Sequence, residues 1–186
     1  MAFVLPKQED ESGTYMELES ISWLIKNRLR PELHEGETKR IWITILSWFF
    51  SAAAGYATGP EMTMDGQRRA DVVATHIFKT TRMNEINFLV VECKAQKYIT
   101  TPTAWGKAFG ELKGYLAYIY HNKYKKRSGK RLFGAIAIGR TVKFYEWVGG
   151  KDSPLKVIAG EDQPLYINRQ CRTVTDWLTY IRENHV

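Results

Sequence analysis

The chain has 186 residues, of which 44% are hydrophobic and 25% charged, a composition that fits one packed domain and excludes a disordered protein. A formal net charge of +7 favours a partner rich in phosphate groups, although a basic protein without such a partner carries the same charge. The two cysteines, Cys93 and Cys171, are too few for a disulfide framework, and no cysteine–histidine cluster has the spacing of a zinc site.

The start of the chain predicts a short segment followed by a helix. Residues 1–13 are polar and show no secretory signal, so we expect a mobile segment and an intracellular protein, cytoplasmic or nuclear. Thr14 and Glu17 have the S/T-x-x-E spacing of a capping box. This predicts a helix from residue 14 to about residue 29, because the residue before Pro31 avoids the helical conformation. Residues 14–186 are expected to form a single domain.

Residues 41–60 carry no charge and begin with IWITILSWFF, a stretch that approaches the length of a membrane span. Thr44, Ser47 and Ser51 interrupt it, and its strongly apolar part ends near Ala54. We therefore predict a buried helix over residues 38–54 and no membrane partner. Because this helix is apolar on nearly all sides, a homodimer packed on it is a further hypothesis.

The remaining elements predict an α/β domain with a central mixed sheet. Two stretches rich in Val, Ile and Phe, residues 69–78 and 86–95, are separated by the polar sequence TTRMNE and predict a hairpin. The other expected elements are a short strand within residues 61–67, a helix over 105–120, a basic loop over 121–131, strands over 132–138 and 141–148, an irregular stretch over 149–166 and a closing helix over 173–183.

The sequence FLVVECKA carries the strongest chemical signal. Alternate side chains of a strand share a face, so Glu92 and Lys94 point to the same side. If the hairpin turns between Arg82 and Met83, Asp71 faces Lys94 and lies diagonally from Glu92. A slip of one residue would break this arrangement. The hairpin therefore predicts two carboxylates and one lysine at one end of the sheet.

Such a group suits metal-assisted hydrolysis of a phosphodiester. Two carboxylates are typical ligands of Mg²⁺, which takes further contacts from water and substrate phosphate. The metal polarises a phosphoryl oxygen and lowers the pKa of bound water, and Lys94 would stabilise developing charge or orient the water. The alternative is a salt bridge at a strand end without a chemical role.

Asp71 followed by Glu92-Cys93-Lys94 at the end of an apolar strand resembles the D…(D/E)xK signature of the PD-(D/E)XK nuclease superfamily. The shared core of that superfamily is a helix, three strands, a helix and a strand. GELKGYL, with Glu111 and Tyr115, resembles the Q-x-x-x-Y element of RecB-like and type I restriction-subunit members, and GAIAIGRTVKFYEW resembles the strand–turn–strand that follows there. The resemblance covers roughly residues 15–148 and is nearest to small stand-alone fungal members.

Two positions depart from the family pattern: Ala70 stands where the motif name has proline, and Glu111 stands in place of glutamine. The resemblance implies a restriction-endonuclease-like fold (αβββαβ) and a nuclease that uses Mg²⁺ or Mn²⁺. It also implies that Asp71 and Glu92 bind the metal, with Lys94 as the third catalytic residue. Glu111 and Tyr115 are supporting candidates.

Glu17 is a further supporting candidate, because many members place an acidic residue of the first helix near the metal. Its capping role is an equally good explanation. Two other functions stay open. The chain could be an inactive member of the fold that binds nucleic acid or protein, or it could perform metal-assisted chemistry on a small molecule.

The basic loop is the candidate nucleic-acid contact, and Tyr124 within it could stack on a base. A solvated loop or a nuclear-localisation patch would have the same composition. The residues expected to bind phosphate are Lys123, Lys125, Lys126, Arg127, Lys130 and Arg131.

Overall fold

The computed structural model describes residues 5–63, 69–124, 131–148 and 155–185. Within these residues, seven strands form one mixed, open sheet in the order β1-β2-β3-β4-β5-β6, with β7 paired to β5. Neighbouring strands are antiparallel except β3 and β4, which are parallel. The strands are β1 (Tyr56–Thr63), β2 (Arg69–Lys79), β3 (Met83–Lys94), β4 (Leu132–Ile138), β5 (Thr141–Trp147), β6 (Leu155–Ala159) and β7 (Leu165–Tyr166).

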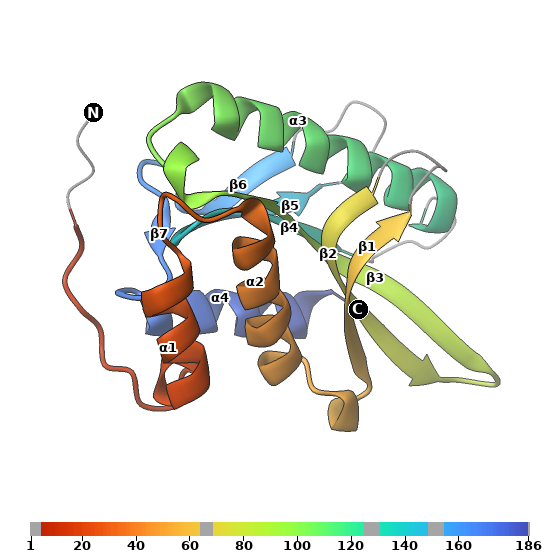
Figure 1. Ribbon diagram of the computed structural model, residues 1–186. Coiled ribbons are helices and arrows are strands. Elements are labelled where there is room, and N and C mark those ends of the chain that lie inside the picture. The colour runs from red at the N-terminus through yellow and green to blue at the C-terminus, as the bar shows by residue number, and fades with distance from the viewer. Residues whose placement is uncertain (1–4, 64–68, 125–130, 149–154, 186) are drawn as a thin grey trace.

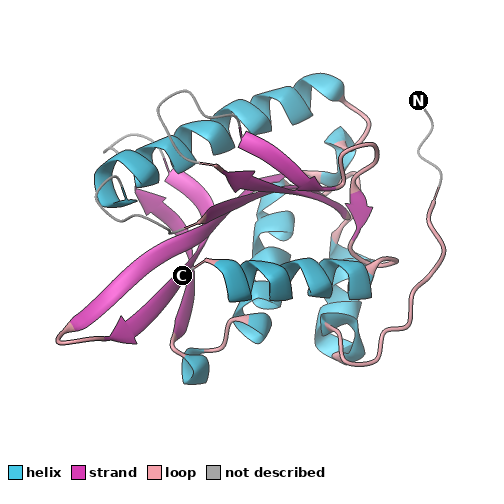
Figure 2. Ribbon diagram, turned by 180° about the vertical axis from the view of Figure 1, so that it is seen from behind, coloured by secondary structure: helices cyan, strands magenta, loops and turns pink. Residues whose placement is uncertain are grey.

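Helices cover both faces of this sheet. Helix α3 (Pro102–Ile119) connects β3 to β4 and lies on one face, as a crossover between parallel strands requires. The other face is covered by α1 (Glu19–Arg28), α2 (Glu35–Phe49) and α4 (Cys171–Asn184), and Figures 1 and 2 show the same three layers from opposite sides. The expected α/β class with a central mixed sheet is confirmed.

The two central strands explain this layering. Every residue of β4 is buried, and β3 is buried from Ile86 to Cys93. Long apolar runs of this kind are typical of strands that are covered on both faces. At Gly134 an added Cβ would lie 2.9 Å from the Leu112 side chain, so α3 packs against β4 as closely as a glycine allows. Helix α3 is therefore fixed relative to the end of β3.

The N-terminal helix differs from the prediction. Thr14 caps a single turn of 3₁₀ helix (Tyr15–Glu17), and its hydroxyl accepts a hydrogen bond from the Met16 amide at 3.2 Å. Helix α1 then begins at Glu19, because Leu18 adopts an extended conformation. Glu17 accepts a hydrogen bond from the Gly13 amide at 2.7 Å, which is a capping role.

The segment before Thr14 contacts the C-terminal part of the chain. The Glu9 amide donates to the Arg169 carbonyl at 2.8 Å, and the Glu9 carboxylate accepts from the Thr173 amide at 3.0 Å. Arg172 and Asp10 form an ion pair at 3.1 Å. Residues 1–4 of the expected mobile segment lie outside the described residues.

Helix α2 begins at Glu35 and ends at Phe49, earlier than predicted at both ends. It buries one face, which carries Ile41, Trp42 and Ile45, whereas Trp48 is 36% exposed. The predicted helix is therefore buried on one face, and its apolar surface at Trp48 is left exposed. None of the helices in the described ranges has the length and apolar character needed to cross a membrane. The homodimer remains a prediction that sedimentation would test.

The hairpin of β2 and β3 has a different register from the predicted one. Val91 pairs with Val72, whereas a turn between Arg82 and Met83 would have paired it with Ala74. The turn lies at residues 80–82, and the ladder is irregular between Ala74 and Thr75. On the Asp71 side of this irregularity the shift is two residues, which keeps the side chains there on their predicted faces.

Two further boundaries are corrected. The short strand expected within residues 61–67 is β1, which begins earlier, at Tyr56. The stretch expected to be irregular contains β6 and β7, because both pair with β5.

Candidate active site

Lys94, the last residue of β3, lies at the centre of the candidate site. Its Nζ is 2.5 Å from Glu92 Oε1 and 2.9 Å from Glu111 Oε2. Glu35 Oε2 lies 3.9 Å away, and the Lys94 side chain is only 15% exposed. One ammonium group therefore joins carboxylates from β3, α3 and the start of α2.

The local structure accounts for this convergence. Alternation along β3 puts Glu92 and Lys94 on one side, and close packing of α3 brings Glu111 to them. The Lys94 carbonyl accepts hydrogen bonds from the Thr38 hydroxyl and the Gly139 amide, both at 3.0 Å. These two bonds fix the end of β3 against α2 and against the turn after β4.

Asp71 lies beside this group on β2. Its Oδ2 accepts a hydrogen bond from the Cys93 amide at 2.9 Å, and its Oδ1 is 2.8 Å from Lys39 Nζ. Continuing the observed register by one residue sets Asp71 opposite Glu92 rather than opposite Lys94, which corrects the predicted pairing. The predicted residues are brought together, but the basic partner of Asp71 is Lys39 of α2.

Glu92 is the most strongly perturbed group of the site. Burial, and then the negative charge of Asp71, raise the pKa of Glu92 to about 8, although Lys94 acts in the opposite direction. Its Oε2 atom is buried and accepts no hydrogen bond from the described residues, while a hydrogen bond joins the Glu92 and Glu111 carboxyl groups. A buried carboxyl oxygen that accepts no hydrogen bond is uncommon in proteins and calls for a specific reason.

The neighbouring charges and burial also shift the pKa values of Lys94, Glu111 and Glu35. Burial acts to lower the pKa of Lys94, but its hydrogen bonds and ion pairs with Glu92 and Glu111 raise that pKa above the usual value. For Glu111, burial acts to raise the pKa, and the hydrogen bonds with Lys94 and Glu92 outweigh it and lower the pKa. Burial raises the pKa of Glu35. Lys94 is therefore held as a cation among acidic groups.

Two supporting candidates lie apart from the Lys94 contacts. The Tyr115 hydroxyl donates to the Arg69 carbonyl at 2.8 Å, and burial, followed by the charge of Glu92, raises the pKa of Tyr115 to about 12. Tyr115 therefore holds the start of β2, two residues before Asp71. Glu17 bonds to Gly13, and among the described residues no contact joins it to the cluster.

Sequence reasoning missed Glu35, Thr38 and Lys39. Their spacing of three and four residues places them on one face of α2, which is a signal that could have been read. However, the predicted helix begins only at residue 38, which leaves Glu35 outside it.

The basic loop is only partly described. Lys125, Lys126, Arg127 and Lys130 lie outside the described residues, as does the side chain of Lys123. Arg131 Nε is 2.6 Å from Glu146 Oε1, so this side chain is occupied in an ion pair within the fold.

Tyr124 is buried, and its hydroxyl donates to the Asn87 carbonyl at 2.7 Å. The expectation that Tyr124 stacks on a base is therefore wrong. Asn87 precedes Lys94 by seven residues along β3, or about 23 Å, so this end of the loop lies far from Lys94. The hypothesis that the loop flanks the site does not hold for its described end.

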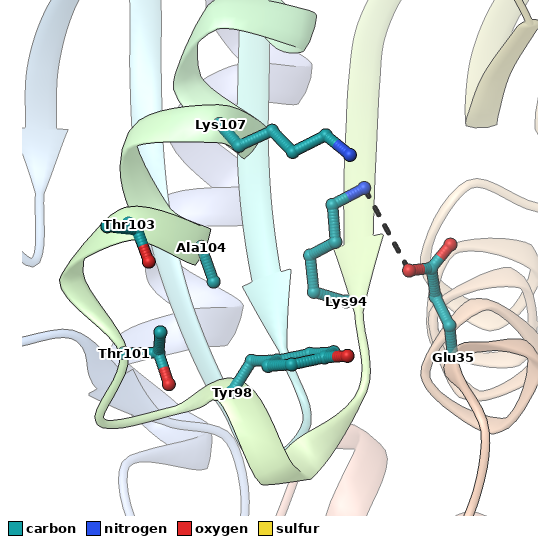
Figure 3. Close-up of a pocket in the computed structure, with 7 residues that line it drawn as sticks. All are labelled: Glu35, Lys94, Tyr98, Thr101, Thr103, Ala104 and Lys107. Carbon is teal, nitrogen blue, oxygen red and sulfur yellow. Dashed lines mark ion pairs between the residues drawn. The ribbon is translucent and has the colours of Figure 1, made fainter.

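A pocket of about 420 Å³ opens beside Lys94. Figure 3 shows it between the end of β3, the first turns of α3 and the start of α2. The residues that line it are Glu35, Lys94, Tyr98, Thr101, Thr103, Ala104 and Lys107.

In the described part of the chain, no three His, Cys, Asp or Glu side chains converge as a ligand set for a metal ion. Mg²⁺ is commonly held by one or two carboxylates, with water and substrate phosphate as its other ligands. Two carboxylates, the number that Asp71 and Glu92 provide, would be enough for a site of this smaller type.

Comparisons with protein-family models, with curated proteins and with solved structures give no match for this chain. The fold and the site themselves therefore define the class: an α/β protein with a partly buried carboxylate–lysine cluster at the end of a central strand.

Proposed function

We propose that the chain is a metal-dependent nuclease of the PD-(D/E)XK type, which hydrolyses phosphodiester bonds of nucleic acid. The observation that carries the proposal is the contact of Lys94 with both Glu92 and Glu111, next to Asp71 on the adjacent strand. Asp71, Glu92 and Lys94 are the residues of the D…(D/E)xK signature, and Glu111 stands at the glutamine position of the element that follows it.

The order of elements supports a restriction-endonuclease-like core. Helix α2, strands β1, β2 and β3, helix α3 and strand β4 follow one another along the chain. This is the helix, three strands, helix and strand that the resemblance implies. The remaining strands extend the sheet beyond β4.

The chemistry of the carboxylates fits a divalent cation. Glu92 has a buried oxygen without a hydrogen-bond donor, and the neighbouring Asp71 charge disfavours ionisation of Glu92. A cation held by Asp71 and Glu92 would favour the ionised forms of both. Mg²⁺ or Mn²⁺ would polarise a phosphoryl oxygen and lower the pKa of a bound water there.

The protein's own residues then have separate tasks. Lys94 offers a fixed positive charge to the phosphate as negative charge develops on it. Glu111 and Glu92 hold this ammonium in place from two sides. Tyr115 and the Cys93 amide position Asp71 through the start of β2 and through β3.

A purely structural ion pair explains the cluster less well. Burying charged groups is expensive, and a buried pair is weak evidence of stabilisation. Here several charges and one unsatisfied carboxyl oxygen share a site that opens into a pocket. Perturbed groups in such a position are typical of functional sites.

The direct test is to incubate the purified protein with single-stranded and double-stranded DNA and RNA, with Mn²⁺ and with a chelator. Cleavage that requires Mn²⁺ supports the proposal. No cleavage of any substrate, together with specific binding, would favour the inactive binding module. The pocket of about 420 Å³ has the size of small-ligand sites, so hydrolysis of a small phosphate ester alone would favour small-molecule chemistry.

Removing Lys39 should strengthen metal binding. Its ammonium pairs with Asp71 at 2.8 Å, and a cation bound by Asp71 must compete with this ion pair. In Lys39→Met we expect Mn²⁺ to bind about fivefold more tightly without substrate, equivalent to roughly 1 kcal/mol. Titration calorimetry measures the affinity, with the exposed Lys26→Met on α1 as the control. Equal affinities in both variants would argue against Asp71 as a ligand.

Neutralising the basic loop should weaken binding of unrelated sequences to a similar extent. In a variant with Lys125, Lys126 and Arg127 changed to glutamine, the slope of log affinity against log salt should become shallower by about one to three units, near one for each phosphate that the loop no longer neutralises. The control changes Lys26 and Arg30, which are exposed near the ends of α1. An unchanged slope would show that the loop is only a solvated surface.

A further inference from the structure

The pocket beside Lys94 has an aromatic wall. In Figure 3 the Tyr98 ring is seen nearly edge-on below Lys94, with one face turned to the space between Lys94 and Ala104. Tyr98 is 39% exposed, and the Lys97 ammonium lies 5.1 Å from its ring centroid. An exposed ring at a pocket wall is available for stacking on a flat ligand.

This ring is held in position by the surrounding backbone. Tyr98 ends a turn of 3₁₀ helix that begins at Gln96, and its amide donates to the Ala95 carbonyl at 3.1 Å. Gln96 Oε1 accepts a hydrogen bond from the Arg140 amide at 2.7 Å. Since the turn follows β3 and is tied to the residue before β5, the backbone that carries Tyr98 is held in place at the edge of the pocket.

The opposite side of the pocket carries the ammonium groups of Lys94 and Lys107 together with the carboxyl group of Glu35. Lys107 extends from α3, is 74% exposed and lies 3.9 Å from Glu111. Figure 3 shows its ammonium pointing toward that of Lys94. Glu111 lies between these two ammonium groups, 2.9 Å from Lys94 and 3.9 Å from Lys107. The exposed Lys107 is therefore the ammonium group that a further anion can reach. Thr101 and Thr103 add hydroxyl groups to the lining of the pocket.

We propose that this pocket binds one unpaired nucleotide of the substrate, next to the phosphodiester at Lys94. This inference rests on the proposed nuclease function and narrows its substrate to single-stranded nucleic acid. Tyr98 stacks on the base, and Lys107 meets a neighbouring phosphate. Stacking on a ring and contacts with point charges do not depend on which base is bound. The pocket should therefore bind an unpaired nucleotide without preference for its base.

A duplex does not fit this arrangement. Inside a duplex both faces of a base are covered by its neighbours, and reaching one face requires unstacking or flipping the nucleotide out. A pocket of about 420 Å³ has the size of a small-molecule site. The single strand can therefore stack on Tyr98, whereas the intact duplex cannot.

The test measures binding without cleavage. The intact protein is titrated, in the presence of a chelator, into a short fluorescein-labelled single strand and into the blunt duplex of the same sequence. We expect Tyr98→Ala to lose about 5- to 150-fold in affinity for the single strand, and little for the duplex. Tyr98→Phe, which keeps the ring, should bind like the wild type. The matched control is Trp23→Ala, an aromatic residue of α1 that is 52% exposed.

The outcomes separate this inference from the nuclease proposal. If Tyr98→Ala binds the single strand as the wild type does, or loses affinity for both substrates equally, the pocket inference is wrong even when Mn²⁺-dependent cleavage is observed. If the single strand binds through Tyr98 but no metal ion supports cleavage, the binding pocket stands and the hydrolytic function fails. Thermal unfolding of each variant checks that the fold is retained.

Discussion

Replacing Lys94 by methionine is expected to reduce Mn²⁺-dependent cleavage of nucleic acid by at least about a hundredfold, the effect typical of losing one group that stabilises charge in a transition state. Methionine keeps most of the length of the side chain but removes the ammonium that contacts Glu92 and Glu111. Asp71→Asn and Glu92→Gln should have effects of at least this size, because each removes a charged metal ligand. Initial rates at saturating Mn²⁺ measure the loss.

These variants should remain folded, which distinguishes a chemical role from a structural one. Asparagine at position 71 can still accept the hydrogen bond from the Cys93 amide. Burial and the Asp71 charge raise the pKa of Glu92 to about 8, so glutamine resembles the neutral carboxyl group that the metal-free protein favours at pH 7. Lys113→Met, on the exposed side of α3, is the matched control. Wild-type cleavage in all three site variants, or their unfolding, would refute the assignment.

The sequence predicted that Glu92 and Lys94 lie together because both belong to one strand. Alternation along β3 determines that Glu92 and Lys94 share a side, and this needs no knowledge of the rest of the chain. Glu111 was indicated by the resemblance of GELKGYL to the Q-x-x-x-Y element. Both glutamates now contact the same lysine, Lys94.

The partners of Asp71 could not be predicted in the same way. The register of β2 against β3 depends on the length of the turn and on the irregularity between Ala74 and Thr75, neither of which has a clear pattern in the sequence. The pairing of Asp71 with Lys39 depends on how α2 docks at the end of the sheet. Docking of this kind is decided by tertiary packing. The same holds for the burial of Tyr124, because its basic neighbours in the sequence indicated an exposed loop.

One glycine next to the site, Gly139, leaves no room for a side chain. Gly139 lies in the turn between β4 and β5 with a φ of 54°, in the left-handed region that favours glycine. A Cβ added there would lie 2.1 Å from Gln96 Oε1 and 2.6 Å from Gln96 Cα. The second atom belongs to the backbone, so a change of side-chain rotamer cannot relieve the clash.

We therefore expect Gly139→Ala to destabilise the protein by about 3 kcal/mol, from strain in the left-handed region together with overpacking against Gln96. In a chain of this length that corresponds to a fall of roughly 6–12 °C in the unfolding temperature, measured by circular dichroism or calorimetry. The matched control is Gly110→Ala on α3, where an added Cβ meets nothing within 4 Å. Alanine there should be neutral or stabilising by up to about 1 kcal/mol, because it is the better helix former.

The same substitution should also disturb the site, since relief of the clash has to move the turn at Gln96. That turn follows Lys94 directly and carries Tyr98, and the Gly139 amide bonds to the Lys94 carbonyl at 3.0 Å. Below its unfolding temperature, Gly139→Ala should bind single-stranded nucleic acid more weakly than Gly110→Ala. If Gly139→Ala is as stable as the wild type, the turn can accommodate a Cβ. In that case the close approach of Gly139 to Gln96 does not help to hold Tyr98 and Lys94 in place.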